Sequence, residues 1–221
     1  MDPQSTYDRI AGHFSSTREY AWPEVESFLA SATDGTPARP TLNKPVELAI
    51  DIGCGNGRHT ESLIEYVDHV VGVDVSRGLL HEARIRADSR GYADATWFVH
   101  GDAAALPICD DVIDLGVYVA TIHHLRPRSA RVRSLNELSR VLRPGGVALV
   151  SAWSTAHDRF DREAGFDTTL DWTLPGGETV PRFYHIYAPE EFEADIEASE
   201  LELRTHQVSS GNCYATVRSP D

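Results

Sequence analysis

The sequence has little of several residue types, and each shortage excludes a class of protein. Lys44 is the only lysine among 20 basic residues, and all the others are arginine. The three cysteines, Cys54, Cys109 and Cys213, are odd in number and form no Cys-x-x-Cys pair. This spacing supports neither a disulfide framework nor a zinc site, so we predict no metal centre.

Long apolar runs are also missing. No stretch approaches the ~20 apolar residues of a membrane span, and the N-terminus lacks the basic, apolar and small-residue succession of a secretory signal. We therefore expect a cytoplasmic protein with no membrane partner. At about 150 residues per domain, the length favours a single domain over 1–221, and no domain-length repeat is visible.

Positive charge is scarce relative to negative charge. The chain has 34 acidic residues against 20 basic ones, which gives a formal net charge of -14. Such a surface stays soluble where salt screens charge repulsion, which suggests a salt-adapted organism such as a halophilic archaeon. An ordinary acidic protein from a mesophile is the alternative. Because phosphate neutralisation drives non-specific nucleic-acid binding, any nucleic-acid site must be a local basic patch.

The most informative stretch present runs from Val46 to Gly57. Residues 46–52 form an apolar run with β-branched members, which is typical of a strand buried on both faces of a parallel sheet. Gly53, Gly55 and Gly57 then allow positive φ angles and close approach of a ligand to the backbone. A helix follows over about 58–66. The pattern predicts a nucleotide or nucleoside pocket, although a purely structural turn would look the same.

Apolar runs and helical patterns then alternate along the chain. The expected strands are 46–52, 69–76, 95–102, 112–120 and 147–153, and the expected helices between them are 58–66, 79–90 and 128–142. This βαβα alternation implies right-handed crossovers and an α/β fold with a doubly wound sheet.

The two ends of the chain have a different character. Apolar residues at helical spacing predict two N-terminal helices before an aperiodic spacer over 33–45, so 1–45 forms a helical cap and 46–221 the core. Near the C-terminus, we expect a helix over 189–201 and two strands joined at Gly211-Asn212, which predicts an antiparallel hairpin. We expect 154–188 to be an irregular insertion that carries the substrate site.

Two aspartates narrow the choice of ligand. Asp74 ends the second expected strand 21 residues after Gly53, where it could accept from ribose hydroxyls, and Asp102 ends the third. Either one alone would usually be a helix cap. The glycines alternate without the two-residue gap typical of NAD sites, and Lys44 precedes the whole sheet, which excludes a Tyr-x-x-x-Lys pair. This pattern favours S-adenosylmethionine over a dinucleotide.

With these features, residues 46–218 resemble the class I S-adenosylmethionine-dependent methyltransferases. The resemblance extends to Asp102-Ala103, Ile122-His-His-Leu125 and Leu142-Arg-Pro-Gly-Gly146. It implies a Rossmann-like doubly wound seven-stranded sheet with an antiparallel C-terminal hairpin. The implied cofactor-binding residues are Asp51, Gly53, Cys54, Gly55, Asn56, Gly57, Asp74, Val75, Asp102 and Ala103.

Motifs outside the shared core carry a finer resemblance. Thr17-Arg18-x-x-x-Trp22-Pro23, Ile122-His-His-Leu125 and Arg182-Phe-Tyr-His185 resemble the archaeal and eukaryotic tRNA wobble-uridine carboxyl methyltransferases, a module also fused to an AlkB-like tRNA hydroxylase. The resemblance implies methylation of the carboxylate of 5-carboxymethyluridine in the tRNA anticodon loop. That carboxylate is already ionised at pH 7, so the reaction needs alignment rather than a general base.

The same resemblance supplies candidate catalytic residues. Arg18 and Arg182 match its motif positions and would hold the acceptor carboxylate, and His124 would lie beside the transferred methyl group. The alternative reading of either arginine is a surface residue. The substrate-binding candidates are Tyr20, His123, Tyr184, His185, Arg126, Arg128 and Arg131. Between 126 and 143 stand six arginines and one glutamate, a basic helix for tRNA phosphates or simply a solvated helix face.

The family also resembles methyltransferases that work with a small zinc-binding activator subunit. That subunit pairs with the edge of the third strand, where Trp97 and Phe98 would form an apolar edge that needs cover, so we predict a heterodimer. Two other readings stay open: a small-molecule methyltransferase acting on a quinone or polyketide, and a non-enzymatic adapter that retains the fold.

Overall fold

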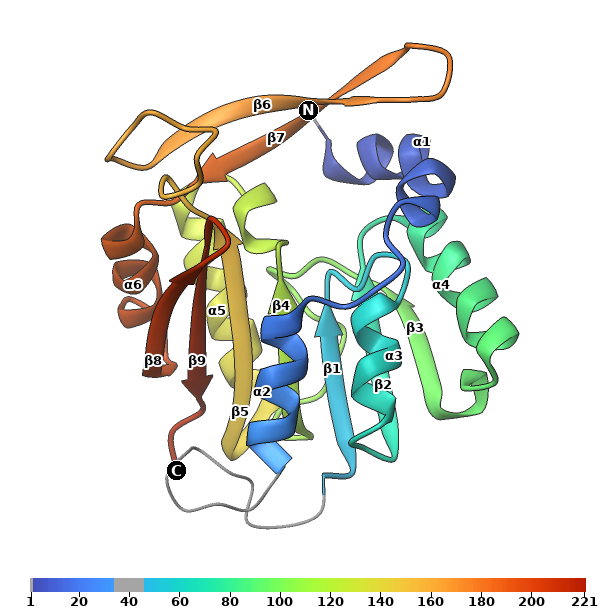
Figure 1. Cartoon of the computed structure of the whole chain (residues 1–221). Coiled ribbons are helices and arrows are strands. Elements are labelled where there is room, and N and C mark those ends of the chain that lie inside the picture. The colour runs from blue at the N-terminus through green and yellow to red at the C-terminus, as the bar shows by residue number, and fades with distance from the viewer. Residues whose placement is uncertain (1, 34–45) are drawn as a thin grey trace.

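A mixed seven-stranded sheet forms the centre of the protein in a computed structural model that describes residues 2–33 and 46–221 (Figure 1). Its strand order is β3-β2-β1-β4-β5-β9-β8, in which β9 alone is antiparallel to the other six strands. The strands are β1 (Leu48–Ile52), β2 (His69–Asp74), β3 (Thr96–His100), β4 (Ile113–Val119), β5 (Leu142–Trp153), β8 (Glu202–Ser209) and β9 (Asn212–Arg218). The predicted doubly wound sheet with its C-terminal hairpin is confirmed. The expected spacer lies almost wholly outside the described residues.

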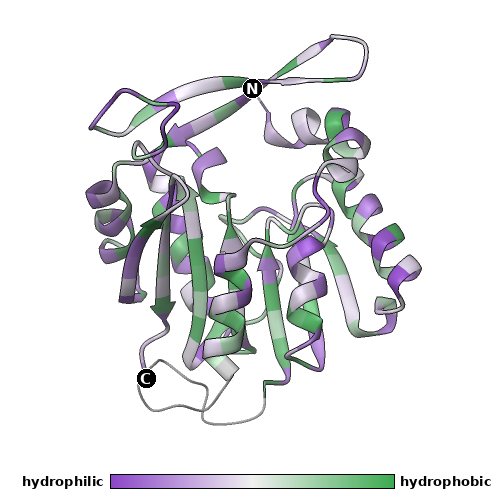
Figure 2. Cartoon of the chain, in the orientation of Figure 1, coloured by the Kyte–Doolittle hydropathy of each residue, from purple (hydrophilic) through white to green (hydrophobic). Residues whose placement is uncertain are grey.

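The sheet is buried because helices cover both of its faces. One apolar cluster joins β1, β4 and β5 to α2 (Pro23–Thr33) and α3 (Arg58–Ile64). The other joins the opposite face to α5 (Arg128–Val141) and α6 (Pro189–Glu197). Figure 2 shows the result as apolar strands enclosed by helices with polar outer faces. Further helical elements are α4 (Arg77–Arg90), η1 (Ala93–Ala95) and η2 (Ile122–His124).

The segment expected to be irregular is ordered as a separate hairpin, so that prediction is wrong. β6 (Phe166–Thr173) and β7 (Thr179–Ile186) pair in antiparallel register along their whole length. Along β6 the more buried and the exposed side chains alternate, which is the pattern of a strand with one face covered. The hairpin lies across the end of the sheet at which the parallel strands finish (Figure 1).

Helix α1 (Pro3–Ser16) completes the roof over that end of the sheet. Asp2 caps its first turn by accepting from the backbone of Ser5, and Asp8 accepts from the hydroxyl of Ser76 at 2.7 Å, which holds α1 against α4. The hairpin meets α1 through the indole Nε1 of Trp172, which donates to His13 Nδ1 at 3.0 Å. No helix within 2–33 or 46–221 has the length and apolar character needed to cross a membrane.

Candidate active site

The glycine turn between β1 and α3 forms the floor of the site. The backbone N–H groups of Gly53 and Cys54 both donate to the carbonyl of Val73, at 2.7 and 3.1 Å. Gly53 has φ +70°, and a Cβ there would lie 2.1 Å from the hydroxyl oxygen of Thr121. No side chain fits at this position, so the main chain itself faces the space above.

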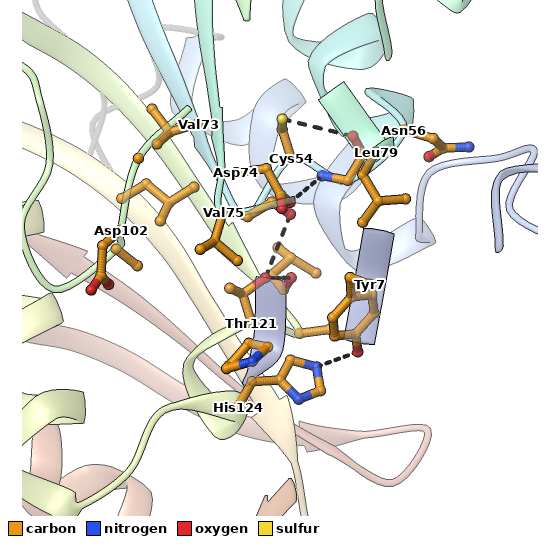
Figure 3. Close-up of a pocket in the computed structure, with 18 of the residues that line it drawn as sticks. Tyr7, Cys54, Asn56, Val73, Asp74, Val75, Leu79, Asp102, Thr121 and His124 are labelled. Carbon is orange, nitrogen blue, oxygen red and sulfur yellow. Dashed lines mark hydrogen bonds between the residues drawn. The ribbon is translucent and has the colours of Figure 1, made fainter. Parts of the chain in front are cut away.

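A cavity of about 260 Å³ opens above this turn, where β1, β2 and β4 end (Figure 3). Most of the predicted cofactor-binding residues line it: Gly53, Cys54, Gly55, Asn56, Asp74, Val75, Asp102 and Ala103. The turn, the end of β2 and the segment after β3 therefore meet at one place, as their order in the sheet requires.

Two of the predicted cofactor residues lie behind the turn and do not line the cavity, which corrects their assignment. The buried carboxylate of Asp51 accepts from the hydroxyl of Thr60 at 2.7 Å, and burial raises its pKa to about 7. Gly57, with φ +77°, begins α3, and a Cβ there would lie 3.3 Å from Ala83. Both residues shape the turn.

The carboxylates in the cavity suit a cationic adenosine-containing ligand. Asp74 accepts from the backbone N–H groups of Gly55 and Ser76, at 2.9 and 2.8 Å, and burial raises its pKa to about 6. Its oxygens retain acceptor capacity for ribose hydroxyls. Asp102 lies apart from it at the cavity edge (Figure 3), and its carboxylate could accept from an adenine amino group. These donors and acceptors, with the glycine floor, fit S-adenosylmethionine.

Tyr7 and His124 form a wall on the far side of the cavity. The Tyr7 hydroxyl lies 2.8 Å from His124 Nε2, and His124 Nδ1 lies 2.8 Å from the carbonyl oxygen of Phe183 (Figure 3). A carbonyl oxygen only accepts, so Nδ1 carries the proton. Burial lowers the pKa of His124 to about 4, so the ring is neutral at pH 7 and Nε2 accepts from Tyr7. With both nitrogens engaged, His124 is a fixed wall and not a free base.

Beyond this wall lies a second cavity of about 200 Å³. Its lining residues are Pro3, Thr6, Tyr7, His124, Leu125, Arg126, Arg182 and Phe183. The guanidinium carbon of Arg126 stands 4.9 Å from the centroid of the Phe183 ring. The described lining contains two arginines and no carboxylate, which is the opposite of the first cavity.

Arg18 and Arg182 meet at this end of the site, where both contact one aromatic ring. Their guanidinium carbons lie 5.4 and 4.9 Å from the centroid of the Trp172 ring. Burial and then the charge of Arg182 lower the pKa of Arg18. Among residues 2–33 and 46–221, neither arginine has a carboxylate partner, and Arg182 Nε is buried without an acceptor. The two arginines that motif positions selected are thus brought together with uncompensated charge.

Three other predicted substrate-binding residues are buried and do not line either cavity. His123, Tyr184 and His185 are 1, 3 and 6% exposed. His123 Nδ1 accepts from the backbone of Trp153, and both ring nitrogens of His185 are held by carboxylates, those of Asp167 and Glu191. These buried side chains therefore help to hold the roof in place. Tyr20, in contrast, is 80% exposed and lies outside both cavities.

The predicted phosphate-binding helix α5 also requires correction, because most of its arginines already have partners. Arg128 and Arg131 pair with Asp195, and Arg131 itself is 4% exposed. Arg140 and Arg143, near the end of the helix, pair with acidic residues as well. Only Arg133 within α5 is both exposed and without a described carboxylate partner.

Sequence reasoning missed several residues that line or flank the two cavities. Tyr7, Phe14 and Thr121 line the first cavity, although no sequence motif marks them as binding residues. Trp172 was hidden in the supposed irregular insertion, although the alternation along β6 predicts a strand with Trp172 on its covered face. Arg58, directly after the glycine turn, lines the first cavity.

Comparisons with known proteins agree with this site. A family model described as a methyltransferase domain matches residues 50–150. The chain is 34% identical to "Putative methyltransferase ECU09_1500" of Encephalitozoon cuniculi over 217 residues, which is 96% of this chain and 92% of the relative. It is 35% identical to the tRNA (carboxymethyluridine(34)-5-O)-methyltransferase ALKBH8 of Macaca fascicularis over 148 residues, which is 67% of this chain. That match spans only 19% of the length of the macaque protein.

A solved structure extends the comparison to the whole fold. It is described as a complex between the Haloferax volcanii Trm112 methyltransferase activator and the putative methyltransferase, and it aligns with a TM-score of 0.66 at 14% identity, covering 100% of this chain and 98% of that chain. At that identity the likeness shows the fold alone. Together with the cavity geometry and the full-length relative, these matches show that the chain belongs to the class I S-adenosylmethionine-dependent methyltransferases.

Proposed function

We propose that the protein methylates the carboxylate of 5-carboxymethyluridine-type wobble uridine in cytoplasmic tRNA and produces the methyl ester. The observation that carries this proposal is the second cavity, which is lined by Arg126 and Arg182 and shares the Tyr7–His124 wall with the cofactor cavity. A cavity of this charge beside a methyl donor suits an anionic acceptor. The relatives named as tRNA methyltransferases supply the polymer to which that acceptor belongs.

When bound, S-adenosylmethionine supplies an electrophilic methyl group on a positively charged sulfur. The protein then has to hold an acceptor oxygen in line with that group, which is mainly a matter of proximity and orientation. Arg182 presents its guanidinium toward the second cavity, supported by the Trp172 and Tyr184 rings at 4.9 and 5.1 Å. A planar guanidinium held this way can fix a carboxylate by two parallel hydrogen bonds, with Arg18 supplying further positive charge.

No proton has to be removed from such an acceptor. A carboxylic acid with an ordinary pKa near 4 is ionised at pH 7, so its oxygen is already nucleophilic. This matches the position of His124, whose ring is neutral and whose two nitrogens are engaged by Tyr7 and Phe183. We assign His124 a positioning role in the wall, where it keeps Tyr7 and the β7 backbone in place.

The tRNA itself would contact the rim of the second cavity. Arg126 lines that cavity, Arg133 is exposed on α5 and Tyr20 is exposed on the N-terminal segment. Because the other α5 arginines are paired internally, this basic surface is small, and tight binding of the polymer calls for a contribution from another chain.

We propose that a small zinc-binding activator subunit supplies this additional tRNA-binding surface and pairs with the exposed edge of β3. Trp97, on that strand, is 51% exposed and stacks on His69 with ring centroids 5.0 Å apart. Phe98 points the other way, because a Cβ on Gly72 would lie 2.9 Å from its ring. Trp97 is thus the apolar contact available to a partner. A chain that is monodisperse and fully active alone would rule the heterodimer out.

The decisive experiment is a methyl-transfer assay with labelled cofactor and three tRNA preparations: unmodified, carboxymethyl-bearing and ester-bearing. We expect label only in the carboxymethyl-bearing tRNA. Mild base should hydrolyse the methyl ester and release the label as methanol. The assay should be run with and without the activator and with free carboxylic acids as competing acceptors. Labelling of small acids in the absence of any tRNA labelling would instead favour the small-molecule methyltransferase.

A further inference from the structure

Arg58 has an unusual environment, and the proposed acceptor site gives this residue no role. It is the first residue of α3 and lines the cofactor cavity next to the glycine turn. Its guanidinium carbon lies 5.3 Å from the centroid of the Trp22 ring. Among the described residues it has no carboxylate partner and no hydrogen-bond acceptor, whereas nearby arginines such as Arg86 and Arg90 are bonded to glutamates.

The charge on Arg58 is poorly compensated as well as unpartnered. Burial and then the charge of Arg18 lower the pKa of Arg58 to about 10, so the side chain remains protonated at pH 7 at an energetic cost. A partly desolvated guanidinium with free N–H donors beside a cavity is ready to bind an anion. The stack on Trp22 holds the guanidinium plane at the cavity wall.

The remaining charges in the cavity indicate which anion this is. The charged residues in its described lining are Asp2, Asp74, Asp102 and Arg58, so Arg58 is the one permanent cation among them. S-adenosylmethionine has a single anionic group, the carboxylate of its methionine part. Its adenosine part is accounted for by Asp74 and Asp102, which leaves the methionine part on the side of the turn where Arg58 lies.

We propose that Arg58 is a cofactor-binding residue whose guanidinium pairs with the α-carboxylate of S-adenosylmethionine, while Trp22 supports the guanidinium from behind. This gives a role to Trp22, which belongs to the N-terminal motif but does not line either cavity. It also separates the arginines by function: Arg58 serves the donor, and Arg182 serves the acceptor. The inference rests on the cofactor and not on the identity of the acceptor.

The test compares the binding of two cofactors by titration calorimetry with the full chain and no acceptor. Decarboxylated S-adenosylmethionine retains the sulfonium and the ammonium but lacks the carboxylate. We expect the wild-type protein to bind S-adenosylmethionine about 10- to 100-fold more tightly than this analogue, the range for a hydrogen bond to a charged group. Arg58→Gln should reduce that ratio to about one, and Arg58→Lys should keep part of it.

The exposed Arg159→Gln variant is the matched control and should preserve the full ratio. If Arg58→Gln binds both cofactors more weakly by the same factor, Arg58 only supports the fold and the proposal is overturned. Equal binding of the two cofactors by the wild-type protein overturns it too, and that measurement does not require any variant to fold. Because no tRNA is present, either outcome leaves the proposed acceptor untouched.

Discussion

The two cavities of this protein are neighbours with opposite charge. The described lining of the first contains three aspartates and one arginine, and that of the second contains two arginines and no acid. They share Pro3, Tyr7, His124 and Leu125, so a single wall separates a cavity with mostly acidic charged residues from a basic one. A sulfonium donor and a carboxylate acceptor would each be attracted to its own side and meet at that wall.

The difference also shows that arginines must be judged by their partners and not by their number. The charge-rich helix α5 looks basic in the sequence, yet Arg128 and Arg131 are compensated by Asp195. Arg18 and Arg182, isolated in the sequence, have no carboxylate partner among the described residues. In a chain of net charge -14, an arginine without an acidic partner is a stronger functional signal than a basic run.

The largest expected effect tests whether Arg131 stabilises the fold rather than binds tRNA. Arg131→Ala leaves the buried carboxylate of Asp195 with less compensation, which should cost about 3–5 kcal/mol of folding free energy. Thermal unfolding should show the midpoint falling by roughly 6–20 °C, whereas Arg133→Ala on the same helix should shift it little. An unchanged midpoint combined with weakened tRNA binding would return Arg131 to the phosphate-binding surface.

The next effect tests the second cavity, which is lined by arginines. Arg182→Ala should lower kcat/KM for the acceptor about 100-fold, because a fixed guanidinium is lost from the second cavity. Binding of S-adenosylhomocysteine, measured by calorimetry, should stay within about twofold of wild type. Arg182→Lys keeps the charge but not the planar fork and should recover only part of the rate. A large loss of cofactor affinity would show that the two cavities are not separate in function.

Cofactor binding in the first cavity should depend on pH. The raised pKa of Asp74, about 6, means that the ligand-free carboxyl is largely protonated below pH 6. Ribose hydroxyls bind the ionised form, so cofactor affinity should fall as pH falls through 6 and should be about tenfold weaker at pH 5 than at pH 7. Asp74→Asn should bind more weakly and lose this dependence, while Asp51→Asn, behind the turn, should retain it. A flat calorimetric profile for the wild type would contradict this.

The smallest effect concerns the shared wall. Tyr7→Phe removes the hydrogen bond to His124 Nε2 and should cost about 1 kcal/mol, a shift of roughly 2–4 °C in the unfolding midpoint. Tyr92 provides the matched control, because its buried hydroxyl has no hydrogen-bond partner in the described part of the chain. Tyr92→Phe should therefore be close to neutral. Equal losses in the two variants would mean that the Tyr7–His124 bond does not stabilise the wall.

The floor of the site was predictable because it depends on local patterns. An apolar run, alternating glycines and strand-terminal acids determine a turn and its ligand contacts within a short stretch, and the structure brings Gly53, Asp74 and Asp102 to one cavity. Asp51 and Gly57 were misplaced because a motif does not show which of its members face the ligand and which support the turn.

The roof was less predictable because it depends on contacts between distant segments. Asp195 and Arg131 are 64 residues apart, so no local reading of α5 could reveal that pairing. His185 was expected to face the acceptor, but the carboxylates of Asp167 and Glu191 hold both of its ring nitrogens. The hairpin itself did leave a signal, since the residues from Phe166 to Thr173 alternate in burial as a half-covered strand requires.

Asn56 gives the site a property that bears on how its specificity can change. Its side-chain amide donates to the backbone carbonyls of Ser15 and Arg18, at 3.4 and 2.8 Å, and so ties the N-terminal segment to the glycine turn. Backbone carbonyls are present whatever the side chain, so the path of this segment is held independently of the residues it displays. New acceptor preferences can therefore be selected or engineered at positions 18–21 without rebuilding the cofactor site.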